Sequence, residues 1–136
     1  MVINHHAALI YSMVLVSAAD RNMTDAEFKT IGEIVTHLPV FLDFDVKELP
    51  KIASSCVDLV SADDGLEKIL ERIHKALPPH LCETAYALAC DVAVSDGKAP
   101  SQEVQRMLEL IRHRLGLERL VSAAIERGAR ARYSKL

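Results

Sequence analysis

The chain has 136 residues, a formal net charge of −3 and 50% hydrophobic residues, although only 4% of its residues are aromatic. This length suits one domain with its own core, and no apolar run approaches the ~20 residues of a membrane span. The acidic balance argues against general nucleic-acid binding, which requires a basic surface.

Apolar residues recur at intervals of three and four along most of the chain, a pattern that predicts helices and no strand. Pro, Gly and Asp residues separate the patterns from one another. The fold class is therefore all-α, a single-domain bundle of about seven helices. The helices are expected at about 4–19, 24–37, 46–61, 64–76, 80–95, 100–115 and 117–131.

The fifth expected helix, 80–95, is apolar on nearly all sides, which predicts a central position in the bundle. Its exception is Asp91. Either this side chain faces solvent or pairs with a neighbour, or it is buried and needs an Arg, a backbone donor or a metal as partner.

Two segments of the chain resemble each other. In each, a helix ends at an Asp, a short turn follows, and a Glu opens the next helix; the acids are Asp20 and Glu27 in the first copy and Asp96 and Glu103 in the second. We therefore expect two pseudo-symmetric helix-turn-helix repeats within a single domain. The repeat halves are about 4–38 and 80–115, separated by an insert at 43–78 and followed by the C-terminal helix 117–131 of the domain 1–136.

The four acids have two interpretations. If the repeats pack face to face, Asp20, Glu27, Asp96 and Glu103 share a hard-cation site, for Ca²⁺, Mg²⁺ or Mn²⁺. Alternatively the acids are structural: Thr24 and Glu27 match a capping box, and Asp is at home in turns. Pro100 at the expected start of the sixth helix has no N–H, so a capping box does not explain Glu103.

Other reactive residues give weaker signals. Cys56, Cys82 and Cys90 form no Cys-x-x-Cys pair and are expected to be buried thiols in a reducing compartment. The six histidines lack the spacing of a zinc site, and no nucleophile or phosphate-binding motif is present. We therefore expect no enzyme activity, with a hydrolase that uses the four acids as the less favoured alternative.

The last eleven residues carry four cations, Arg127, Arg130, Arg132 and Lys135, against one acid, Glu126. Cations are favoured at the C-terminal end of a helix, which explains them without a function. A contact with an anionic membrane surface or an acidic partner is the alternative.

The segment Ala93-Val94-Ser95-Asp96-Gly97-Lys98-Ala99-Pro100-Ser101-Gln102-Glu103, leading into a helix that ends Leu115-Gly116-Leu117, resembles the second repeat of the TerB-like tellurite-resistance family. The first copy departs from that pattern, because Asp20-Arg21 stands where the family has Asp-Gly. The resemblance implies a helical fold of two similar halves. It also implies an acidic metal-binding cluster, carried by Asp20, Glu27, Asp96 and Glu103, in which Arg21 would compete with a cation.

The resemblance implies a non-enzymatic stress-response protein, related to tellurite resistance, that binds a divalent cation. The expected location is cytoplasmic, or peripheral at the inner membrane, with no nucleic-acid partner and with protein partners in a stress-response complex. The alternative function is a protein-interaction adaptor, in a co-chaperone or membrane-associated complex, whose acids are structural.

Overall fold

The computed structural model describes residues 3–19 and 24–136, and within these ranges it contains helices and no strand. Seven α-helices follow the expected order, and two short 3₁₀ turns, Pro39–Phe41 and Val46–Glu48, join the second helix to the third. The α-helices are α1 (His5–Ala18), α2 (Asp25–His37), α3 (Leu49–Val60), α4 (Gly65–Ala76), α5 (Pro79–Ala93), α6 (Gln102–Arg114) and α7 (Arg119–Arg132).

Helix α1 forms the centre of the bundle, because all of its residues from Ala8 to Ser17 are buried. It packs on α3, α4, α5 and α6, and its longest interface is with α5. Asn4 begins the helix by accepting a hydrogen bond from the Ala7 N–H at 2.8 Å. The aliphatic residues of α1 are therefore typical of a helix that is enclosed by other helices on all sides.

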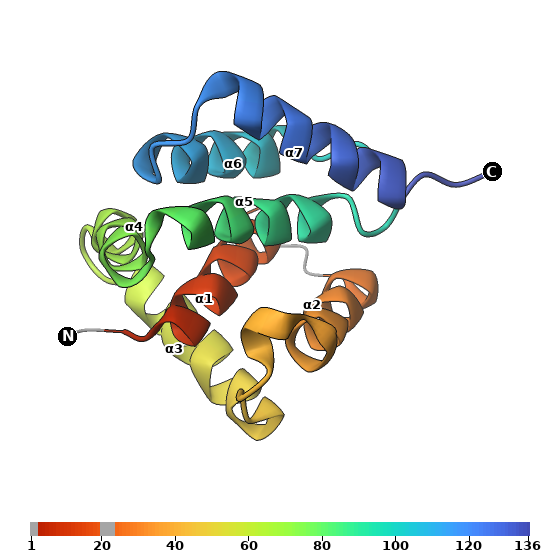
Figure 1. Ribbon diagram of the computed structural model, residues 1–136. Helices are drawn as coiled ribbons and strands as arrows, with labels where there is room; N and C mark the ends of the chain where they lie inside the picture. Colours follow the sequence, from red (N-terminus) through yellow and green to blue (C-terminus); the bar gives the residue numbers. More distant parts are fainter. Residues whose placement is uncertain (1–2, 20–23) are drawn as a thin grey trace.

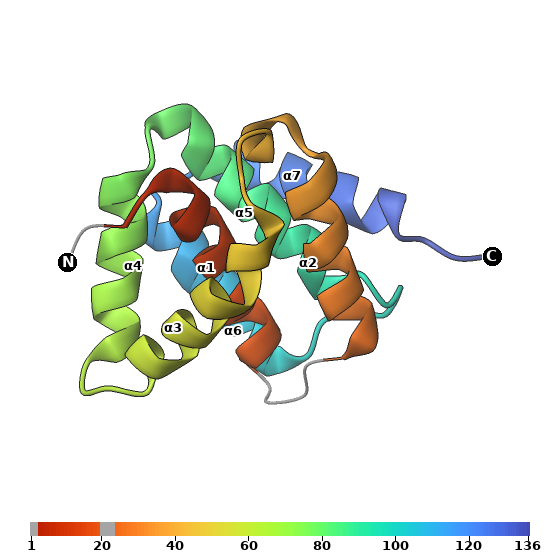
Figure 2. The same cartoon turned by 90° about the horizontal axis from the view of Figure 1, so that it is seen from below.

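Helix α5 occupies the middle layer of the molecule, as its apolar circumference predicts (Figure 1). Helices α6 and α7 lie on one side of it, and α1 and α2 lie on the other. Seven of its residues are buried, among them Tyr86, Ala89 and Cys90. Figure 2 shows the insert helices α3 and α4 beside α1, away from α2.

Two helices expose a large apolar residue near their start. Phe28 on α2 is 57% exposed and Leu120 on α7 is 82% exposed, although each belongs to an apolar face with helical spacing. None of the helices in the described ranges has both the length and the apolar character needed to traverse a bilayer.

Glycine permits two of the helix junctions. Gly116, with φ +69°, ends α6 in the left-handed conformation that the sequence predicts for it. At Gly65 the chain passes so close to the end of α3 that a Cβ atom there would lie 2.1 Å from the Leu59 carbonyl oxygen. The α3–α4 turn therefore requires a residue without a side chain.

Candidate functional site

Of the first pair of predicted metal ligands, Asp20 and Glu27, the structure describes Glu27. Asp20 lies outside the described residues. Glu27 is buried at the start of α2, where its Oε1 accepts a hydrogen bond from the Thr24 N–H at 2.8 Å, while the Thr24 hydroxyl accepts one from the Glu27 N–H at 3.1 Å. The predicted capping box is thus present, and it gives Glu27 a structural role.

The second pair of predicted ligands lies at the start of α6 and in the turn before it. The Asp96 Oδ1 accepts a hydrogen bond from the Lys98 N–H at 2.9 Å, the turn chemistry that Asp commonly supplies. Gly97 continues this turn with φ +78°, and the side chain of Lys135 lies directly over it. Glu103 is exposed in the first turn of α6.

The two helix starts differ by one residue in their caps. Thr24 caps α2, so Glu27 is the third residue of that helix. Ser101, not Pro100, caps α6 through a hydrogen bond from the Val104 N–H, so Glu103 is the second residue. Glu103 is therefore one residue closer to its cap than Glu27 is to Thr24, despite their equivalent positions in the sequence.

No cluster of three or more His, Cys, Asp or Glu side chains suited to a metal ion occurs among residues 3–19 and 24–136. Because Asp20 is outside these ranges, the four-acid site stays a prediction. Glu27 and Asp96 have local roles in a cap and a turn, which matches the structural interpretation for these two acids.

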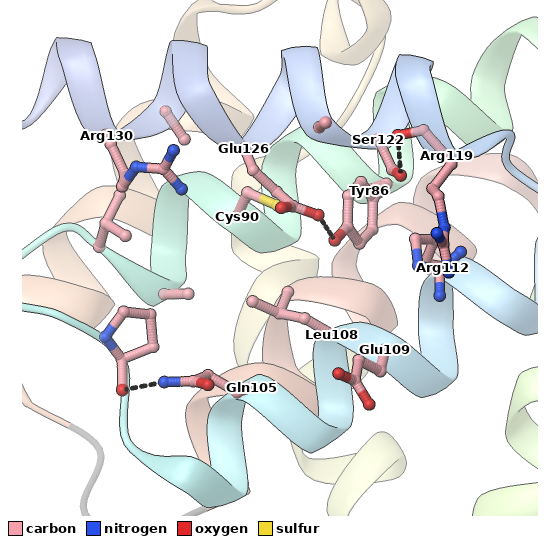
Figure 3. Close-up of a pocket in the computed structure, with 15 residues that line it drawn as sticks. Tyr86, Cys90, Gln105, Leu108, Glu109, Arg112, Arg119, Ser122, Glu126 and Arg130 are labelled. Atoms are coloured by element: carbon pink, nitrogen blue, oxygen red, sulfur yellow. Dashed lines mark hydrogen bonds between the residues drawn. The ribbon is translucent and has the colours of Figure 1, made fainter.

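A groove formed by α5, α6 and α7 is a more complete site than the four acids (Figure 3). It has a volume of about 440 Å³, with α5 as its floor and α6 and α7 as its walls. Helix α7 packs mainly on α5 and makes few contacts with α6. Small and apolar side chains line much of the groove: Ala93, Val94, Pro100, Leu108, Ala123 and Ala129.

One polar pair crosses the middle of the groove. The hydroxyl of Tyr86, a residue that is 2% exposed, donates a 2.6 Å hydrogen bond to Oε2 of Glu126 on α7. Burial and this hydrogen bond raise the pKa of Tyr86 well above its ordinary value. Burial also raises the pKa of the neighbouring Cys90 thiol to about 12, so Cys90 is an unreactive part of the floor.

Three arginines surround the groove. Arg112 extends from α6 and Arg119 from α7 toward the same end, and Arg130 lies at the opposite end (Figure 3). None of the three forms an ion pair with a described residue, although Glu109 and Glu126 line the same groove. The groove thus offers unpaired guanidinium groups around an apolar floor.

An ion pair near the C-terminal end of α7 holds this wall of the groove against α5. Arg132 donates a hydrogen bond to Oδ1 of Asp91 on α5, so the awkward acid of the fifth helix has the Arg partner that its burial requires. Burial raises the Asp91 pKa and the Arg132 hydrogen bond partly offsets this. One of the four C-terminal cations is therefore structural.

A second cavity of about 490 Å³ lies where the start of α5 meets the α6–α7 turn, and Cys82, Glu83 and Glu118 are among its lining residues. It brings together no set of groups with an evident chemistry.

The sequence marked several lining residues as helical but did not bring them together as a site. Arg112 and Arg119 are separated by the α6–α7 turn, and Tyr86 belongs to another helix. The concentration of basic residues toward the C-terminus was the one available signal, because Arg130 belongs to it. Comparison of the chain with protein-family models, curated proteins and solved structures gave no match.

Proposed function

We propose that this protein is a non-enzymatic protein-interaction module that binds a segment of a partner protein in the groove between α6 and α7. The observation that carries the proposal is the groove itself, with an apolar floor and three arginines that have no ion-pair partner among the described residues. Hydrophobic grooves between helices commonly receive an amphipathic helix.

The volume and lining of the groove support binding better than catalysis. Its thiol has a raised pKa, and its tyrosine is held protonated against Glu126. A nucleophile would need the opposite environment, one that lowers its pKa or places a base beside it. The function proposed therefore corresponds to the adaptor interpretation of the sequence, and kinship with TerB-like proteins is a further proposal that rests on the residues of the α5–α6 turn.

The proposal is tested with a displayed library of helical peptides, from which binders of the full chain are selected. The matched variants are Ala123→Trp, which fills the groove from an exposed position, and Ala124→Trp, which places the same side chain outside it. We expect Ala123→Trp to weaken binding at least about tenfold and Ala124→Trp to leave it unchanged. Selected peptides whose affinity is unchanged by Ala123→Trp would place the binding surface elsewhere.

A further inference from the structure

We propose that the occupant of this groove is an acidic amphipathic helix of about three turns, presented by a partner protein. This inference rests on the proposed function and specifies the chemistry of the partner. It follows from the length of the groove, the distribution of its charges and the nature of its floor.

The two ends of the groove set the length of the occupant. Arg119 and Arg130 are eleven residues apart on α7, which corresponds to about 16 Å along the helix. Two residues eleven apart on a partner helix point in directions that differ by only about 20°. A three-turn helix therefore presents a carboxylate to each end of the groove from one face.

The charges of the groove favour an acidic partner over a basic one. Three arginines, Arg112, Arg119 and Arg130, line the groove against two glutamates, Glu109 and Glu126, so the lining carries a formal charge of +1 (three minus two). The arginines have no ion-pair partner among the described residues. The chain as a whole has a net charge of −3, so this locally basic groove stands out from an acidic protein. Opposite charges around such a site promote encounter with the correct partner, and like charges reject the wrong one.

The floor between the arginines requires apolar side chains on the partner. Ala93 lies in the floor and Leu108 and Ala123 line the walls beside it, and the small side chains of the two alanines allow a helix to approach closely. An occupant with Glu at both ends of one face and Leu between them satisfies both the floor and the ends of the groove.

The test uses fluorescently labelled, capped peptides of about 16 residues. The first has Glu at both ends of one helical face with Leu between them, and the second has Lys in place of each Glu. Affinity for the full chain is measured by fluorescence anisotropy at low and high salt. The charge-reversed variant is Arg112→Glu/Arg119→Glu, and its control is Arg106→Glu/Arg127→Glu, which changes exposed arginines of the same helices outside the groove.

We expect the Glu peptide to bind at least about tenfold more tightly than the Lys peptide, with an advantage that decreases as salt screens the charges. Arg112→Glu/Arg119→Glu should reverse the preference and the control should keep it. Equal binding of both peptides, abolished by Ala123→Trp, would overturn the acidic specificity and leave the groove as the binding site. No binding of either peptide, together with no groove-directed peptide from the library, would overturn the proposed function as well.

Discussion

Replacing Tyr86 by Phe tests whether the polar pair in the groove stabilises the fold. The substitution removes the hydroxyl that donates a 2.6 Å hydrogen bond to Glu126 and leaves the buried ring in place, so it creates no cavity on the scale of a lost methyl group. A hydrogen bond to a charged acceptor contributes about 1.5–3 kcal/mol. Because Glu126 is half-buried and regains water, we expect a loss near the lower limit, about 1.5 kcal/mol.

For a chain of this length, a loss of about 1.5 kcal/mol lowers Tm by roughly 5–7 °C. Urea denaturation should show a lower midpoint with an unchanged m-value, since the surface exposed on unfolding is the same. Glu126→Gln keeps an acceptor and should cost less. The double variant Tyr86→Phe/Glu126→Gln should cost less than the sum of the single variants, with a coupling of about 1 kcal/mol.

The same variant has a consequence for binding. Without the Tyr86 hydroxyl, Glu126 keeps its charge but loses a hydrogen-bond donor, so its oxygens are free to accept from a Lys side chain, and the affinity for the Lys peptide should rise relative to that for the Glu peptide. A Tyr86→Phe protein within about 0.5 kcal/mol of the parent stability would refute the reasoning, because water would then serve Glu126 as well as the tyrosine does.

Gly65→Ala should lower the free energy of unfolding by at least about 2 kcal/mol, because its Cβ atom would lie 2.1 Å from the Leu59 carbonyl oxygen. Gly32→Ala in α2, whose Cβ atom would meet nothing within 4 Å, should raise it by about 0.5–1 kcal/mol. Chemical denaturation measures both, and equal effects would contradict the close approach at Gly65. Burial raises the pKa of Cys56 and Cys90 from 9.0 to about 12, so the folded state keeps protons that the unfolded state loses. The stability that is present below pH 9 should therefore be lost as the pH rises toward 12. Cys90→Ala should flatten this alkaline loss, and an unchanged pH profile would argue against the role of that thiol. If the acid cluster binds a cation, titration of metal-stripped protein with Ca²⁺ or Mn²⁺ should raise Tm by an amount equivalent to about 2.7 kcal/mol at a hundredfold excess over Kd. Glu103→Gln should remove the rise, and the exposed control Glu83→Gln should keep it. No rise in the parent protein would leave the acids with structural roles only.

The helical architecture was predictable because it depends on spacing that is visible in the chain. The periodic apolar residues of α4 and the Gly116 terminator of α6 each act locally, so the seven helices are confirmed with ends that differ by at most three residues. The expected start of α6 at residue 100 is two residues too early, because Ser101 supplies the cap and the helix begins at Gln102. A capping serine directly after a proline gives two plausible starts.

The groove was not predictable in the same way, because it depends on a gap between helices. Nothing in the spacing of α7 indicates that it packs on α5 and leaves α6 partly uncovered. The pair formed by Asp91 and Arg132 shows both sides of this limit. The sequence indicated that a buried Asp91 needs a partner such as Arg, and only the packing of α7 identifies Arg132 as that partner.

The difference between the two helix starts bears on the metal hypothesis. A shared site needs Glu27 and Glu103 to point toward one space, yet Glu27 is buried as the third residue of its helix and Glu103 is exposed as the second of its own. A carboxylate that completes a capping box also gives up part of its affinity for a cation, because one oxygen already accepts a backbone hydrogen bond. The groove needs no such rearrangement, since its arginines already surround an open space, and acidic-peptide binding is therefore the experiment to perform first.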